Sequence, residues 1–195
     1  MPYQMFIDGK WLDAHNGGTW DVINPATGTV VQTVPYGGAE DVLAAIDAAT
    51  RAQPAWAALT PYQRAAIMMK VAAIMRERGD ELARITTQEC GKPIIESRGE
   101  WRLSADLYEW FAEEGKRLYG RTIPSRVPTK RFMTQLVPLG VVGSITAWNF
   151  PILLISRKVG AAIAAGNAVV ARPSEFTPLT AMLLMEILQE AGVPD

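Results

Sequence analysis

The first 35 residues place apolar and polar side chains in short runs that are separated by turn-forming residues. Asp8-Gly9 suits the positive φ values of a tight hairpin, and in Asn24–Gly28 the proline fixes φ while the glycine turns the chain. We therefore expect a small β layer at the start of the chain. Its short strands lie within Tyr3–Ile7, Trp11–Leu12, Thr19–Ile23 and Thr29–Val34.

From residue 39 the apolar positions recur with the period of an α-helix. The first predicted helix ends at Pro54, because a proline inside a helix removes a hydrogen bond. The second begins at Thr60, where Gln63 completes a capping box, and ends at Gly79. The apolar face expected on the first helix consists of Val42, Leu43, Ile46 and Ala49.

Two more helices follow, over Asp80–Cys90 and Ile94–Leu118, and then the character of the chain changes. Residues 121–130 hold two prolines among polar residues, which indicates a connection or an exposed arm, and Arg131–Val137 predicts a strand. After residue 138 the pattern is strand, helix, strand, helix. The predicted elements are Val141–Ile145, Pro151–Ala165, Ala168–Ala171 and Pro178–Ala191.

That alternation predicts an α/β fold with a doubly wound parallel sheet. Two strands are too few for such a sheet, because both faces and both edges of a parallel sheet need cover. We therefore expect this part of the sheet to be incomplete, or to dock onto another polypeptide that completes it.

Composition narrows the classes of function. The 195 residues carry 19 Lys and Arg against 20 Asp and Glu, with no dense block of like charge, so nucleic acid is not the expected partner. The start lacks a secretory signal pattern and no apolar stretch is long enough to cross a membrane, which favours a cytoplasmic protein. Cys90 is the single cysteine, so neither an internal disulfide nor a multi-thiolate metal site is expected.

Asn149 is the first candidate for chemistry, since it follows a predicted buried strand and precedes a predicted helix. Ligands of α/β folds bind at such strand ends. Its amide can donate a hydrogen bond to a developing oxyanion, but asparagine is also a good helix N-cap, and spacing alone leaves both interpretations open.

A second candidate site follows the next predicted strand, where Arg172, Ser174 and Glu175 are expected to project at the rim. A cation and a carboxylate there suit the phosphate and ribose groups of a nucleotide. The alternative is a solvated pair of charges at a strand exit. Neither of the common glycine-rich phosphate-binding motifs is present in the sequence.

Several motifs, spread in order along the whole chain, resemble the aldehyde dehydrogenase superfamily. The residues that carry the resemblance are Asn24–Gly28, Trp56, Arg64, Glu89–Pro93, Ile145–Pro151, Arg157-Lys158, Gly166-Asn167, Arg172–Glu175 and Thr177-Pro178. The resemblance implies the N-terminal part of a Rossmann-like cofactor domain. It divides the chain into hairpins and helices at 1–120, an oligomerisation arm at 121–139, and the first βαβα portion of the cofactor sheet at 140–195.

By this resemblance Asn149 stabilises the oxyanion, and a set of residues at the two strand ends binds the cofactor. A carboxylate at Glu175 would repel a 2′-phosphate, so NAD is preferred over NADP. The cofactor-binding set consists of Ile145, Thr146, Ala147, Trp148, Asn149, Arg172, Ser174 and Glu175.

Other positions match less directly or depart from the family pattern. Arg157 resembles the arginine that succinate-semialdehyde dehydrogenases use for the substrate carboxylate, and Lys158 matches a lysine near the active site or is a solvated cation. Arg172 stands where the family usually has lysine, and Ala147 replaces a common proline. Cys90 lies far from the family's nucleophile position and is expected to be a packed or partly exposed thiol.

The nucleophilic cysteine of the family corresponds to no residue here, so we expect the chain alone to be inactive. The resemblance implies NAD(P)-dependent oxidation of an aldehyde, such as succinate semialdehyde, by a homo-oligomeric enzyme of which this chain is the N-terminal portion. The alternative is a non-catalytic chain that assembles with full-length aldehyde dehydrogenase subunits.

Overall fold

A computed structural model describes residues 3–194 of the chain. Of the three predicted parts of the chain, 1–120, 121–139 and 140–195, only the outermost residues of the first and the last lie outside it. Six helices and eight strands are assigned in this part. They are β1 Met5–Ile7, β2 Lys10–Leu12, β3 Thr19–Ile23, β4 Val30–Pro35, α1 Ala39–Ala58, α2 Pro61–Glu77, α3 Gly79–Cys90, α4 Ile94–Gly115, β5 Arg121–Ile123, β6 Phe132–Thr134, β7 Val141–Ile145, α5 Pro151–Ala164, β8 Ala168–Arg172 and α6 Leu179–Ala191.

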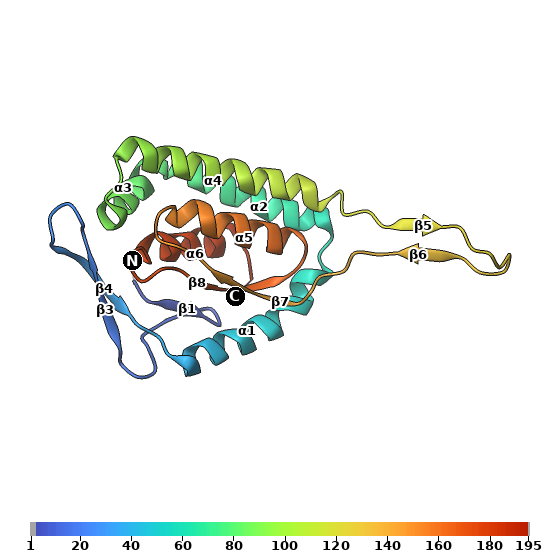
Figure 1. The fold of residues 1–195 in the computed structure, drawn as a ribbon, viewed down its shortest axis with the longest axis horizontal. Helices are drawn as coiled ribbons and strands as arrows, with labels where there is room; N and C mark the ends of the chain where they lie inside the picture. The colour runs from blue at the N-terminus through green and yellow to red at the C-terminus, as the bar shows by residue number, and fades with distance from the viewer. Residues whose placement is uncertain (1–2, 195) are drawn as a thin grey trace.

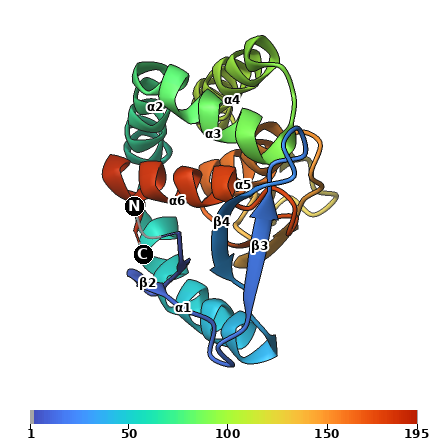
Figure 2. The same ribbon diagram turned by 90° about the vertical axis from the view of Figure 1, so that its left-hand side faces the viewer.

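The predicted hairpins at the start of the chain are confirmed. β1 pairs antiparallel with β2, and β3 with β4. The first turn contains Asp8 and Gly9 at φ 54° and 73°, the left-handed values expected of this dipeptide. Figure 2 shows β3 and β4 crossing one side of the molecule between α1 and α3.

The helices form layers on either side of a two-stranded parallel sheet. β7 and β8 pair in parallel with Ile145 opposite Arg172, which confirms the predicted parallel α/β arrangement. Figure 1 shows this sheet between α1 on one side and α5 with α6 on the other, with α2 and α4 forming a further layer. The main core is apolar and lies among these helices, with Trp101, Tyr108 and Met68 fully buried.

The first helix differs from the prediction in two ways. It continues through Pro54 to Ala58. Trp56, beyond the proline, is 4% exposed and donates its indole N–H to Ile163 O at 2.8 Å, so a tertiary contact holds the helical turn after Pro54. The apolar face predicted for this helix is not its buried face. Val42 and Leu43 are 49% and 61% exposed, whereas Ala48 and Trp56 are buried.

The segment after α4 is an exposed hairpin. β5 and β6 pair antiparallel and extend away from the helices as a long arm (Figure 1). The strand predicted over Arg131–Val137 is shorter, at Phe132–Thr134, and every residue of both arm strands is exposed. Among the described residues, no helix is both long and apolar enough to cross a membrane.

Candidate active site

The loop between β7 and α5 presents Asn149 to solvent. The N-cap of α5 is Phe150, and no side chain of the loop forms a capping hydrogen bond. The interpretation of Asn149 as the helix cap is therefore wrong. Within residues 3–194 its side-chain amide has no hydrogen-bond partner, whereas its main-chain carbonyl is bonded to Lys92.

A glutamate from α4 caps α5 instead. Glu100 Oε1 accepts hydrogen bonds from Ile152 N and Leu153 N, both at 3.0 Å. These are two of the N–H groups that a helix start leaves without an intrahelical partner, and a negative charge there also complements the helix dipole. Glu100 is 5% exposed, so the cap is buried within the protein.

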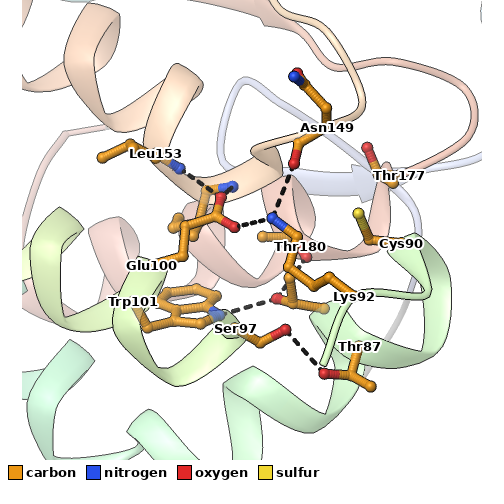
Figure 3. Close-up of polar contacts among 12 residues, drawn as sticks. Thr87, Cys90, Lys92, Ser97, Glu100, Trp101, Asn149, Leu153, Thr177 and Thr180 are labelled. Carbon is orange, nitrogen blue, oxygen red and sulfur yellow. Dashed lines mark hydrogen bonds and ion pairs between the residues drawn. The ribbon is translucent and has the colours of Figure 1, made fainter. Parts of the chain in front are cut away.

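Lys92 joins this cap to the Asn149 loop. Its Nζ lies 2.5 Å from Glu100 Oε2 and donates to Asn149 O at 2.8 Å. The ammonium also lies 4.3 Å from the centre of the Phe150 ring, a favourable cation–π distance. Figure 3 shows Lys92 between Glu100 and Asn149, with the Asn149 side chain extending away from the lysine.

The main-chain carbonyl of Trp148, one residue before Asn149, also accepts hydrogen bonds from side chains elsewhere in the chain. Trp148 O accepts a hydrogen bond from Thr177 Oγ1 at 3.3 Å and a weaker one from Cys90 Sγ at 3.7 Å. Burial raises the pKa of the Cys90 thiol, which disfavours the reactive thiolate. Cys90 is half-buried, as expected of a packed or partly exposed thiol, and its surroundings are not those of a nucleophile.

A second buried glutamate caps α6. Glu89 accepts hydrogen bonds from Leu179 N at 2.8 Å, from Thr180 N at 2.9 Å and from the Thr180 hydroxyl. Burial raises the pKa of Glu89 to about 7, although the bonds from Thr180 and Leu179 act in the opposite direction. The stretch Glu89–Lys92 thus supplies contacts to the starts of both helices that follow the parallel strands.

The far end of α5 is fixed by residues of α1 and α2. Trp56 donates to Ile163 O at 2.8 Å and Arg64 Nε to Ala164 O at 3.2 Å. Arg64 is 6% exposed, and burial lowers the pKa of its guanidinium. The helix that follows Asn149 is therefore held at both ends by polar side chains from α1, α2 and α4.

The predicted cofactor residues divide into exposed and buried sets. Ile145 and Trp148 are 72% and 55% exposed, and Arg172 pairs with Glu175 at 3.1 Å. Ser174 does not project at the rim as predicted. It is buried, and its Oγ accepts a hydrogen bond from Phe176 N at 3.3 Å, so it shapes the turn after β8.

The remaining candidates also separate by exposure. Thr146 is 6% exposed, with its N–H directed to Arg172 O at 3.2 Å, while Ala147 beside it is exposed. Arg157 and Lys158 are both exposed on α5. Among residues 3–194, neither of these two cations forms an ion pair.

The residues after β8 have the charge and the hollow surface that part of a nucleotide cofactor would need. A cavity of about 420 Å³ opens beside Arg172 and Glu175, and most of its lining is apolar. That size and lining are typical of small-molecule sites, but the lining includes Arg172 and Glu175 after β8 and none of residues 145–149 after β7. In the described part of the chain, no cluster of His, Cys, Asp and Glu could hold a metal ion.

Sequence reasoning missed the role of Lys92 and Glu100. Lys92 stood inside a recognised motif without an assigned function, and Glu100 was not singled out. Its partners lie 52 and 53 residues further along the chain, so no local pattern could have revealed the contact. A glutamate on the buried side of a predicted helix was the one available signal, because such charges are rarely buried without a partner.

Comparison with known proteins gives a consistent result. The family model described as "Aldehyde dehydrogenase family" matches residues 11–195. The chain is 50% identical over 191 residues to the succinate-semialdehyde dehydrogenase [NADP(+)] of Escherichia coli, covering 98% of this chain and 40% of that protein. It is 48% identical, with the same coverage, to the glutarate-semialdehyde dehydrogenase of Pseudomonas putida.

Solved structures agree with the sequence relatives. The crystal structure of an NADP-dependent enzyme from E. coli superimposes with a TM-score of 0.97 at 49% identity, covering 98% of this chain and 40% of the other. The chain thus spans about 40% of the length of the relatives it matches. The α/β fold predicted from the motifs is confirmed, and the chain belongs to the aldehyde dehydrogenase family.

Proposed function

We propose that this chain supplies the oxyanion-binding asparagine and part of the cofactor site of an enzyme that oxidises an aldehyde to a carboxylic acid with NAD(P) in the cytoplasm. The observation that carries the proposal is the state of Asn149. Its main chain is fixed by Lys92, while its exposed amide has no partner among residues 3–194. An N–H donor held in this way can stabilise the oxyanion that forms when a thiolate adds to a carbonyl.

The test joins residues 1–195 to the C-terminal three-fifths of the E. coli relative, which the comparison shows to be unmatched by this chain. We expect this chimera to reduce NAD(P) with succinate semialdehyde, and the 195-residue chain alone to be inactive. Asn149→Ala in the chimera should slow turnover by about 10²-fold or more, because one oxyanion donor is lost.

The matched control is Asn16→Ala, which changes an exposed asparagine in the N-terminal segment that lies outside the site. It should leave turnover unchanged. Full activity of Asn149→Ala, or turnover by the isolated chain, would contradict the proposal. An isolated chain that is inactive but binds a full-length homologue would instead support a non-catalytic assembly chain.

We further propose that the aldehyde carries an acid group that Arg157 binds. Arg157 lies about 9 Å along α5 from its first residue, and helical side chains tilt back towards the helix N-terminus, where Asn149 lies. The E. coli and P. putida relatives are named for succinate and glutarate semialdehydes, both of which have a carboxylate. Lys158, exposed beside it, is a second candidate near the reacting group.

The substrate proposal is tested in the same chimera with two aldehydes of equal length. Arg157→Met should raise the KM for succinate semialdehyde by about 10- to 100-fold, the value of a lost charged hydrogen bond. The KM for butanal, which has no carboxylate, should not change. An equal rise for both aldehydes would contradict a role in carboxylate binding.

We propose that the cofactor site prefers NAD to NADP. The Glu175 carboxylate would repel a 2′-phosphate, and its ion pair with Arg172 leaves that repulsion only partly neutralised, because the Arg172 side of the pair is exposed to solvent. Glu175→Gln should therefore tighten NADP binding to the chimera while NAD binding does not improve. Tighter binding of NADP than of NAD by the unchanged chimera would contradict this preference.

We propose that the β5–β6 arm is the surface through which copies of the enzyme assemble. Its exposed apolar side chains include Ile123, Phe132 and Met133, at 44%, 51% and 78% exposure. Exposed apolar surface of this kind marks protein interaction sites. Replacing Met133 by Asp should shift the chimera to smaller species in light scattering, and an unchanged mass would place the contact elsewhere.

A further inference from the structure

We infer that Lys92 is a positioning residue that orders the Asn149 loop, so that the asparagine amide is aimed before substrate binds. The inference rests on the oxyanion role of Asn149 proposed above. Lys92 lies on the connection between α3 and α4, 57 residues from Asn149 in sequence. It contacts the main chain of Asn149 and leaves the side chain free (Figure 3).

The loop has few bonds of its own. Ile145 ends β7, Pro151 begins α5, and Phe150 caps α5 without a side-chain hydrogen bond. The carbonyls of Trp148 and Asn149 bond instead to side chains from elsewhere in the chain: Thr177 and Cys90 for the first, and Lys92 for the second. Of these donors Lys92 is the only one that carries a charge, and charge-assisted hydrogen bonds are the stronger kind.

Lys92 is itself fixed on three sides. Its side chain is 9% exposed, and its ammonium bonds to Glu100, to Asn149 O and to the face of Phe150. Glu100 is held in turn by two N–H groups of α5. The loop and the first turn of α5 are therefore tied to one buried ion pair, and the position of Asn149 follows from it.

This arrangement separates a positioning role from a chemical one. Lys92 donates to a main-chain oxygen on the side of the loop opposite the amide, so it has no direct contact with a substrate oxygen bound by Asn149 (Figure 3). Its loss should leave the asparagine present but poorly aimed. Misplacement of a catalytic group by about 1 Å can lower the rate by 10²-fold.

The first experiment uses the 195-residue chain and measures hydrogen–deuterium exchange of the peptide covering residues 145–155. Lys92→Met should speed exchange there by tenfold or more, while the α2 peptide exchanges as in the unchanged chain. Lys116→Met is the matched control. Lys116 resembles Lys92 in that it pairs with a glutamate, Glu113, at 2.7 Å and lies 5.3 Å from the ring of Tyr62. It lies at the C-terminal end of α4, however, whereas Lys92 precedes the N-terminal end.

The second experiment is a double-mutant cycle in the chimera. Lys92→Met should lower kcat by about 10- to 100-fold with little change in KM, because the amide acts on the transition state. In the Asn149→Ala background the same change should lower kcat by less than about twofold, because Lys92 then has no amide left to aim. Lys116→Met should have no effect in either background.

Unchanged exchange in Lys92→Met would overturn the inference, because the loop would then be ordered without the lysine. Equal losses of kcat in both backgrounds would also overturn it, because Lys92 would then act independently of Asn149. If Asn149→Ala itself leaves turnover unchanged, the proposed function fails and the catalytic half of this inference fails with it. The exchange measurement then still decides whether Lys92 orders the loop.

Discussion

Replacing Glu89 by alanine tests whether a buried carboxylate from α3 holds the start of α6. In the unchanged protein Glu89 is 3% exposed and accepts from Leu179 N at 2.8 Å and Thr180 N at 2.9 Å. Both donor residues are 0% exposed, so neither N–H gains water when the acceptor is removed. The Thr180 hydroxyl keeps a partner, because Thr86 Oγ1 lies 2.9 Å away.

The expected cost follows from these two donors. Each buried N–H left without a partner costs about 1–3 kcal/mol, and the space left by the side chain adds to this. Removing a buried carboxylate offsets part of the loss. We therefore expect Glu89→Ala to lower the free energy of unfolding by about 3–5 kcal/mol, and Glu89→Gln, which keeps one carbonyl oxygen, to cost less.

Urea denaturation followed by circular dichroism measures the effect. The midpoint should fall while the slope with urea stays the same, since the folded surface changes little. Glu77→Ala, at an exposed position near the end of α2, is the control and should stay within about 0.5 kcal/mol of the unchanged chain. A loss below about 1 kcal/mol for Glu89→Ala would refute the capping argument.

Two further predictions concern the same region. Burial raises the pKa of Glu89 to about 7, above its ordinary 4.5, so the folded state binds the proton more tightly than the unfolded state. The free energy of unfolding should therefore decrease as the pH rises from 4.5 to 7. The urea midpoint should fall less over this pH range in Glu89→Gln, which has no carboxylate to titrate at this position. Gly91 has φ +77°, and a Cβ there would lie 2.6 Å from Pro25 Cγ, whereas Gly28 at φ +71° has open space. Gly28→Ala has only the strain of a left-handed backbone, about 1–2 kcal/mol, whereas Gly91→Ala adds the clash with Pro25. Calorimetry should therefore give a lower Tm for Gly91→Ala than for Gly28→Ala. Equal Tm values would contradict the clash.

Local signals predicted local structure correctly. Thr60 and Gln63 form the capping box that their spacing predicts, with Gln63 N donating to Thr60 Oγ1 at 3.3 Å and Thr60 N to Gln63 Oε1 at 2.8 Å. The Asp8-Gly9 turn has the expected positive φ values. Both features depend on residues at most three positions apart, so the sequence contains all that is needed to predict them.

The errors arose where distant contacts override local preference. The helix containing Pro54 was expected to stop there, but Trp56 bonds to a carbonyl 107 residues away and the helix continues. Val42 and Leu43 repeat with a helical period, yet they are exposed in this chain, while the small side chain of Ala48 is buried. Periodicity finds an apolar face, but it does not say which surface will cover it.

The sequence by itself determined the order of the elements, the turns, the parallel βαβα pattern and, through its motifs, the family and the position of Asn149. Only the tertiary structure decided what holds that asparagine. Glu100 reaches α5 across 52 residues and Lys92 reaches Asn149 across 57. Such pairings depend on how helices pack in three dimensions, and no spacing along one chain encodes them. The structure therefore shows that Lys92 contacts the main chain of Asn149 and that Glu100 caps the start of α5.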